Sequence, residues 1–547
     1  MAMSEQIRQL LNPPRVNPWS IGALAIAGVV LLPIVAVIWF ALTPTENIWP
    51  HLWSTTLPRY LRNTLVLMLS VGTLTMMVGT GAAWLVVMYR FPGRQWLQWA
   101  LLMPLAIPSY VGAYALVDFL EYAGPVQTGL REAFGWQTMR DYWFPDIRTR
   151  EAATLVMTAA LYPYVYILSR AAFREQSGAS FEVARALGAG PFARFWRVGL
   201  PLARPAIAAG VAVVMMETVN DYGTVDFFAV QTLTTGIFSV WRQGGNLGGA
   251  AQIACVILSL IVILVTLEKI SRRKSRFAAT ARNQRPITPM ELTGWQAWLA
   301  TALCLAPVLM GFVLPMAVIL SHAFDADQWV APGLREALFW TLTVCGAAAV
   351  LTVLGGLFMV YGVRMTRSNL PRLLMPITAL GYAAPGAVLA LGILVPLAGF
   401  DNWMADRILA VTGNDPGLML TGSAGVLVLA YVVRFFAIAQ GTADAALGRV
   451  APSLPMAARS LGRTAGGTLR AVHVPLIRAS IGSALLLVFV DAVKELPATL
   501  MLFNHDTLAT RVHAKASLED LADAAPAALV ISLVGLAAVA LLARANR

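Results

Sequence analysis

Two short polar clusters interrupt long apolar stretches and carry residues that could act on a charged cargo. The first is ETVNDYGT (217–224) and the second is DAVKELPAT (491–499). An ionisable residue in or near a membrane span is a functional candidate, because burying a charge in lipid is costly. We expect a path for a polar solute here, although the same groups could simply cap helices at the outer interface. The candidate path residues are Asn220, Asp221, Tyr222, Lys494 and Glu495.

The sequence gives no sign of a resident metal or nucleotide site. The three cysteines lie scattered in apolar runs, without disulfide or metal spacing. No G-x-x-x-x-G-K-[ST] motif occurs, so we do not expect the chain to bind ATP. We expect no catalytic residue, no metal centre and no cofactor in this chain. The histidines share no spacing and are expected to be ordinary surface residues: His51, His322, His505 and His513 in outward loops and His473 in a cytoplasmic loop.

Membrane helices must position the two polar clusters. Of the 547 residues, 58% are hydrophobic and 12% are charged, whereas a typical soluble protein has about a quarter charged. Backbone in lipid must satisfy its own hydrogen bonds, so long apolar runs predict helices. We predict an all-α polytopic membrane protein of about twelve transmembrane helices, the first retained as a span. The runs are 19–42, 63–89, 97–120, 153–173, 202–219, 250–268, 295–320, 338–363, 371–399, 421–440, 477–493 and 525–543.

Loop charge predicts how these helices are oriented. The positive charges behind the net charge of +12 fall in every second loop, and therefore on one side of the membrane, which indicates membrane orientation rather than nucleic-acid binding. The positive side is expected to be cytoplasmic, which places both termini inside. The arginine- or lysine-rich stretches are 90–94, 170–204, 269–285, 364–372, 449–478 and the terminal RANR.

The chain repeats itself at long range. FEVARALGAGPFARFWRVGLPLARPAI (181–207) and PMAARSLGRTAGGTLRAVHVPLIRASI (455–481) align at an offset of 274 (462 − 188), and Pro108 meets Pro385 at an offset of 277 (385 − 108). Six helices per half is an even number, so the halves are parallel repeats about an axis along the membrane normal. We predict a first repeat over 1–268, a cytoplasmic linker over 269–294 and a second repeat over 295–547.

Each repeated segment is predicted to form a compact helix–turn–helix on the cytoplasmic face. Gly188 suits the left-handed geometry of a helix end, Pro191 suits the first turn of a second helix, and Pro201 is expected to open the next membrane helix. A single amphipathic hairpin could rest on lipid headgroups. Two copies with matched spacing instead favour docking on a two-fold symmetric partner.

The glutamate, glycine and Leu-Pro spacing of the first copy resembles the signature loop of permease subunits of bacterial ATP-binding-cassette importers. The resemblance implies two ATPase-coupling loops, at about 174–201 and 442–475. The second copy departs from the pattern, with Met456 in place of the glutamate and Val474 in place of the leucine, which suggests an asymmetric grip. The implied coupling residues are Glu182, Val183, Ala184, Arg185, Gly188, Leu200 and Pro201, then Met456, Ala457, Ala458, Arg459, Gly462 and Pro475.

Longer stretches in both halves, including ETVNDYGTVDFFAVQTLTTGIFSVW and KELPATLMLFNHDTLATRVHAKASLEDLADAA, are similar to the fused two-repeat permeases of ferric iron importers, which implies the type I importer permease fold. The resemblance implies a bacterial inner-membrane protein that works by alternating access. Its implied partners are a homodimeric ATPase subunit that uses ATP and Mg, a periplasmic substrate-binding protein and the lipid bilayer.

Three other functions stay open from the sequence. Close relatives of this kind carry other small solutes such as thiamine, polyamines or sulfate-like ions. A proton-coupled secondary transporter would use Asp221 or Glu495 as a proton relay, and would leave the two matched loops without a purpose. A membrane anchor without transport is the third.

Overall fold

The computed structural model describes residues 18–273, 287–324, 329–365, 369–378, 381 and 384–545. Eleven helices in these ranges are long and apolar enough to cross a membrane, and a bent pair, 94–106 with 109–134, would make twelve. The all-α multi-pass prediction is confirmed. Part of the predicted linker (274–286) and the chain ends (1–17 and 546–547), which are predicted to be cytoplasmic, lie outside the described residues.

The elements follow one another in two similar series. The first series is α2 (Pro18–Leu42), α3 (Trp49–Ser54), α4 (Leu57–Met88), β1 (Tyr89–Arg90), α5 (Arg94–Ala100), η1 (Met103–Ala106), α6 (Ser109–Leu120), α7 (Pro125–Phe134), α8 (Arg150–Arg174), α9 (Gly178–Ala186), α10 (Pro191–Arg194), η2 (Phe195–Gly199), α11 (Leu200–Asn220), α12 (Gly223–Phe227), α13 (Leu233–Phe238), η3 (Ser239–Gln243) and α14 (Leu247–Arg273).

The second series is β2 (Met290–Glu291), α15 (Trp295–Val308), η4 (Leu309–Val313), α16 (Leu314–Ala323), α17 (Leu334–Met365), α18 (Asn369–Thr378), α20 (Gly386–Thr412), α21 (Ala424–Gly448), α22 (Ser453–Ser460), α23 (Ala465–Thr468), η6 (Leu469–His473), α24 (Val474–Val493), α25 (Pro497–Leu502), α26 (Leu508–Ser517) and α27 (Leu521–Ala545).

The sequence repeat is also a repeat of structure. Helices α4 and α17 both have 32 residues, and helices α8 and α21 both have 25. They begin at offsets of 277 (334 − 57) and 274 (424 − 150), as the aligned motifs do. The short helices α13 and α26 both begin with a capping box, at Thr232 and Thr507. Each half therefore builds the same series of elements from a diverged sequence.

The compact units differ from the sequence halves. One unit contains α2 together with α17 to α25, and the other contains α3 to α16 together with α26 and α27. Helix α2 therefore packs with second-half helices, and close backbone approach makes this possible: a Cβ on Gly392 of α20 would lie 2.1 Å from the Pro33 carbonyl of α2. In the other unit, a Cβ on Gly311 would lie 2.3 Å from the Ala159 carbonyl of α8. Small residues at such contacts are typical of membrane helix pairs.

Two predicted spans have a different shape from a single straight helix. The run 97–120 bends by 94° between η1 and α6, and the run 371–399 is divided between α18 and α20, which continues to Thr412. Pro108 and Pro385 are the N-caps after the breaks, with ψ of 145° and 147°. A proline restricts the residue before it to extended backbone, so the helix ends there even though the composition stays apolar.

Candidate functional site

The first coupling loop forms the predicted helix–turn–helix, which we call hairpin 1 (174–201). Helix α9 ends at Ala186, and Gly188, two residues later, has a φ of +80° in the left-handed region. The Gly188 N–H donates to the Arg185 carbonyl at 3.0 Å and the Ala189 N–H donates to the Ala184 carbonyl at 2.9 Å. These bonds satisfy carbonyls that the end of the helix would leave without partners. Pro191 then begins α10, as predicted.

The second coupling loop, hairpin 2 (442–475), repeats this backbone. Gly462 has a φ of +82°, its N–H donates to the Arg459 carbonyl at 3.0 Å, and the Arg463 N–H donates to the Ala458 carbonyl at 3.0 Å. Helix α23 begins without a proline, and the Thr464 side chain caps it by accepting from the Gly467 N–H. The two hairpins therefore share a turn geometry although only some of their side chains are shared.

The predicted coupling residues occupy matched positions on the two hairpins. Leu187 and Leu461, just before the two turn glycines, are 83% and 84% exposed. An exposed leucine at the tip of each hairpin offers an apolar contact to a partner. Glu182, Val183, Arg185 and Gly188 in hairpin 1 and Met456, Ala457, Arg459 and Gly462 in hairpin 2 are exposed, while Ala184 and Ala458 are half-buried.

Pro201 lies in the first turn of α11, as predicted, although the membrane span as a whole begins earlier, at Pro191. Residues 195–199 form a turn of π-helix, so one span continues from Pro191 to Asn220 through Leu200 and Pro201. The matching π-turn in hairpin 2 is 469–473, ahead of Pro475. Proline removes a helical hydrogen bond and clashes with the preceding turn, and a wider π-turn ahead of it relieves both. Each hairpin is therefore joined continuously to a membrane helix.

An aromatic side chain from helix α4 anchors hairpin 1, and one from helix α17 anchors hairpin 2. Trp84 packs against Phe173, Phe181 and Phe195, and a Cβ on Gly199 would lie only 2.4 Å from its ring. At the equivalent positions, the smaller Tyr361 meets the larger His473 with ring centroids 5.5 Å apart. Hairpin 1 pairs a large side chain, Trp84, with a glycine, whereas hairpin 2 pairs two rings of intermediate size. Both pairs therefore fill the same contact.

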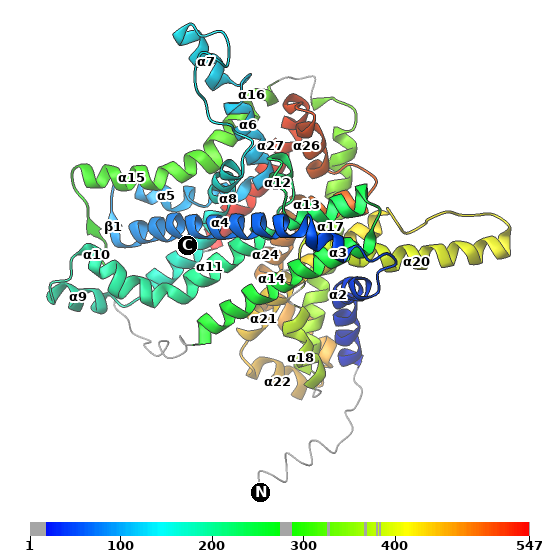
Figure 1. Cartoon of the computed structure of the whole chain (residues 1–547). Helices are drawn as coiled ribbons and strands as arrows, with labels where there is room; N and C mark the ends of the chain where they lie inside the picture. The colour runs from blue at the N-terminus through cyan, green and yellow to red at the C-terminus, as the bar shows by residue number, and fades with distance from the viewer. Residues whose placement is uncertain are drawn as a thin grey trace. The chain divides into compact units, whose positions relative to one another are not determined.

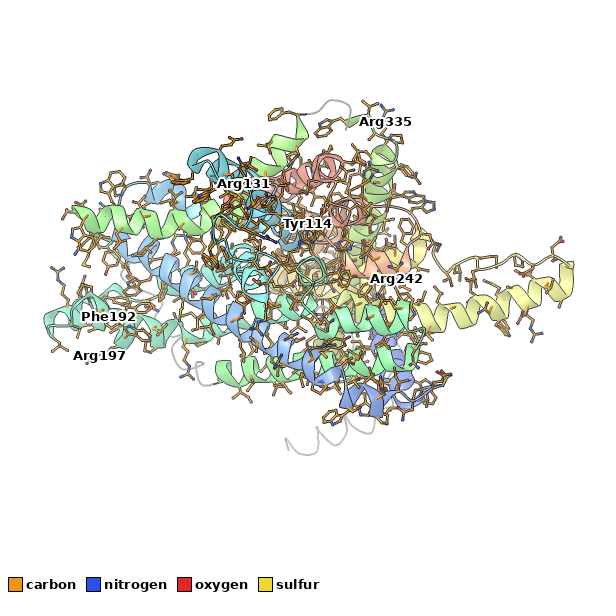
Figure 2. The ribbon with its side chains drawn as sticks, turned by 45° about the horizontal axis from the view of Figure 1, so that its top comes forward. Tyr114, Arg131, Phe192, Arg197, Arg242 and Arg335 are labelled. Carbon is orange, nitrogen blue, oxygen red and sulfur yellow. The ribbon has the colours of Figure 1, made fainter. Side chains whose placement is uncertain are left out.

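The exposed surfaces of the hairpins differ. Phe192 and Trp196 are 75% and 51% exposed on hairpin 1, whereas Gly466 and Arg470 stand at the matching positions of hairpin 2. Hairpin 1 lies at one end of α4 and α11, and α3 and α13 lie at the other end (Figure 1). Figure 2 shows Phe192 and Arg197 at this end, on the opposite side of the unit from Arg242. The aromatic pair gives hairpin 1 a more apolar contact surface.

The described part of the linker lies against hairpin 1. Strand β2 pairs in parallel with β1, with Tyr89 opposite Met290. Arg194 of α10 donates to the Met290 sulfur at 3.5 Å. Glu182 and Arg185 border a cavity that is also lined by linker residues 287–290. The segment that joins the two halves therefore contacts the helix expected to dock on the ATPase.

The first polar cluster is an ordered hydrogen-bonded group. The Asp221 carboxylate accepts from the Ser109 hydroxyl at 2.5 Å, from the Thr224 hydroxyl at 3.0 Å and from the Thr224 N–H at 2.9 Å. Burial raises the pKa of the Asp221 carboxyl, and these hydrogen bonds oppose the rise. Asp221 thus caps the first turn of α12. Asn220 is buried, and Tyr222 stacks on Phe238 with ring centroids 3.9 Å apart.

The second polar cluster repeats this cap with different side chains. The Glu495 carboxylate accepts from the Ala498 N–H at 3.2 Å and lies 3.5 Å from the Arg434 Nε. Burial raises the pKa of Glu495, and Arg434 opposes the rise. Burial likewise lowers the pKa of Lys494, with Asp491 opposing it. Capping, one of the two interpretations from the sequence, is therefore observed at both clusters; a path between Asp221 and Glu495 stays a prediction.

Two histidines are not the surface residues that we predicted. His473 is 7% exposed and packs on Tyr361, and His513 is 9% exposed. The His513 Nδ1 lies 2.7 Å from the Tyr114 hydroxyl oxygen, across 399 residues of sequence. No spacing rule connects residues so far apart, so the sequence offered no signal for this pair. Within the described ranges, no three His, Cys, Asp or Glu side chains are grouped to hold a metal ion.

Comparison with known families identifies the region that carries hairpin 1 and the first polar cluster. Residues 75–276 match the family model of the binding-protein-dependent transport system inner membrane component. This part of the chain is therefore similar to a membrane component of a transport system.

Relatives extend the similarity to both halves of the chain. The Fe(3+)-transport system permease protein FbpB 2 of Haemophilus influenzae is 25% identical over 480 residues, which cover 86% of this chain and 87% of that protein. A probable sulfate transport system permease protein cysT of Chlorokybus atmophyticus is 25% identical over 262 residues, 45% of this chain and 86% of the relative. The molybdenum transport system permease protein ModB of Escherichia coli is 26% identical over 200 residues, 36% of this chain and 84% of the relative.

Proposed function

We propose that this chain is the transmembrane permease of an ATP-binding-cassette importer that moves ferric iron into the cytoplasm by alternating access. The observation that carries the proposal is the pair of hairpins with one backbone geometry, at equivalent places in two repeats. A homodimeric ATPase presents the same surface twice, so two matched hairpins fit its two subunits. The similarity over both halves to a Fe(3+)-transport permease favours iron as the cargo.

The mechanism follows from how each hairpin is attached. Hairpin 1 continues through a π-turn into the span that ends at Asn220, and Trp84 ties it to the neighbouring helix. A displacement of the hairpin is therefore passed to packed membrane helices rather than absorbed by a flexible loop. ATP-driven closure of the ATPase pair would move both hairpins and turn the path outward, and hydrolysis would reset it. A nearly complete two-state shift needs about 5.5 kcal/mol of differential binding.

Transport in reconstituted vesicles tests this function. The permease, its ATPase and an iron-loaded periplasmic binding protein should take up ferric iron only with Mg-ATP on the cytoplasmic side. Uptake should persist when an ionophore collapses the proton gradient. Uptake that needs the gradient and ignores ATP would establish the secondary transporter instead, and absence of any uptake would favour the anchor. Sulfate and molybdate, named by relatives that match about half of this chain or less, are the alternative cargos to load.

A further inference from the structure

Three potential metal ligands converge beside the first polar cluster, from segments that are distant in sequence. Helix α26 brings His513, whose Nε2 lies 3.8 Å from the Asp226 carboxylate. Tyr222 is hydrogen-bonded to the same carboxylate, and its ring centroid lies 5.9 Å from that of His513. The imidazole is largely buried, while the Asp226 side chain is 40% exposed. The group is therefore enclosed by protein and open to solvent at the carboxylate.

The distance between the His513 and Asp226 side chains suits two ligands of one cation better than a direct hydrogen bond between them. A separation of 3.8 Å between His513 and Asp226 is longer than a hydrogen bond. Two ligands that each bind one ion at about 2.0–2.2 Å lie about 3–4 Å apart. By contrast, the pair His322 and Asp118 in the same unit is closed at 3.0 Å. Phenol and carboxylate oxygens are hard donors, which a small, highly charged cation prefers.

A neighbouring tyrosine would orient the histidine ligand. The Tyr114 hydroxyl oxygen, 2.7 Å from the His513 Nδ1, would accept a hydrogen bond from the Nδ1–H and leave the Nε2 lone pair directed at Asp226. Metal-binding histidines generally have such an oxygen partner. Figure 2 shows Tyr114 away from the end that carries Phe192 and Arg197, so the group is remote from the ATPase-coupling surface.

We propose that Tyr222, Asp226 and His513 form a transient site for a ferric ion on its way into the permease. The inference rests on the proposed function as an iron importer and names the residues that receive the cargo. On binding, the Tyr222 phenol releases its proton to solvent and forms an oxygen–iron bond, and the iron stays ferric. Three protein ligands leave the other coordination positions of the iron to water or to ligands from the periplasmic binding protein that delivers it. Such a site would hold the ion loosely enough for release.

Visible absorption of the purified full-length permease tests the site without transport. Titration with ferric nitrilotriacetate should produce a tyrosinate-to-iron charge-transfer band that gallium(III) nitrilotriacetate displaces. Y222F should abolish the band, and D226N and H513Q should weaken iron binding. Y114F should retain the band but reduce affinity roughly 10–100-fold, as expected for a partner of a metal ligand. H322Q is the matched control, since it removes a histidine of a closed pair, and should leave the titration unchanged.

Uptake and ATP hydrolysis separate this site from the proposed function. In vesicles, D226N should slow uptake of ferric iron while ATP hydrolysis stimulated by the loaded binding protein is retained, which also shows that the variant is folded. A wild-type protein that imports iron but shows no band, or a Y222F protein that keeps it, would overturn the site and leave the importer intact. A wild-type protein that imports no iron would refute the function itself.

Discussion

The buried carboxylate of Glu495 leaves no room for a side chain at residue 386, which is a glycine. Placing the equivalent residues of the first half at these two positions tests this. Residue 386 is equivalent to Ser109 in the first half (386 − 109 = 277), and Glu495 is equivalent to Asp221 (495 − 221 = 274). The first half pairs a serine with the shorter acid, and the second pairs glycine with the longer acid. A Cβ on Gly386 would lie 2.0 Å from the Glu495 Oε1.

The expected destabilisation follows from what holds Glu495 in place. Its carboxylate accepts from the Ala498 N–H at 3.2 Å and lies 3.5 Å from the Arg434 Nε, and the residue is only 4% exposed. The carboxylate cannot move away from a new Cβ without losing these contacts. Overpacking of a filled interior costs about 1–3 kcal/mol, and we expect Gly386→Ser to lie near the upper end of that range.

The double variant Gly386→Ser with Glu495→Asp should recover much of this loss, because it recreates the 2.5 Å hydrogen bond between Ser109 and Asp221. Coupling between residues in contact is typically 0.5–3 kcal/mol. The assay is thermal unfolding of the detergent-solubilised permease. Gly399→Ser is the matched control, since Gly399 lies in the same helix with open space around its Cβ position. If Gly386→Ser is no less stable than this control, or the double variant is no better than Gly386→Ser, the reasoning is wrong.

Four further predictions concern the hairpins, the second polar cluster, which has two, and the linker. Replacing Gly188 and Gly462 together with valine puts side chains at φ of +80° and +82°, at roughly 1–2 kcal/mol each; the loaded binding protein should then no longer stimulate ATP hydrolysis, and full stimulation would contradict coupling through the hairpins. Arg434→Gln leaves the Glu495 carboxylate buried without its ion-pair partner and should lower the unfolding free energy by about 3–5 kcal/mol. Burial raises the pKa of Glu495 above 4.5, so the folded state holds this proton more tightly than the unfolded state; stability relative to Glu495→Gln should therefore fall as pH rises above about 4.5, and a rise would refute this. Leu292→Pro removes the 3.0 Å hydrogen bond from the Leu292 N–H to strand β1 and should speed protease cleavage of the linker, while an unchanged rate would show that the strand pair does not hold it.

Local sequence was sufficient for the helices and the turns of the hairpins. Apolar runs located the spans, and the matched spacing of Gly188 and Gly462 predicted two left-handed turns, which are observed at φ of +80° and +82°. These features depend on a residue and its near neighbours in the chain. The breaks before Pro108 and Pro385 were missed, because hydropathy stays high through them and only the backbone restriction of proline marks them.

The contacts that define the polar clusters could not be predicted in this way. The Ser109 hydroxyl reaches Asp221 across 112 residues, and the Tyr114 hydroxyl reaches His513 across 399. Each pair forms only because particular helices pack together, and the order of the helices along the chain does not determine which ones do. Helix α2 packs with second-half helices, and α16 packs with α27 and α6, although the sequence boundary lies between α14 and α15. A repeat in sequence therefore predicts the elements of each half but not the packing partners of its first helix.

The compensated pairs show what the two halves must keep and what they are free to change. Trp84 over Gly199 and Tyr361 beside His473 fill the same contact with different volumes, and both leave the π-turn and the left-handed glycine in place. If an ATPase pair moves both hairpins, as we propose, the two hairpins must move by the same distance. That distance depends on the backbone geometry of each hairpin and on its attachment to the membrane helices. The strength of binding to a partner depends on the exposed side chains, and these differ between the two hairpins. Phe192 and Trp196 of hairpin 1 are replaced by Gly466 and Arg470 in hairpin 2. The two hairpins thus share a backbone geometry and differ in their exposed side chains. This is expected if the two partner subunits move together but are bound with unequal strength.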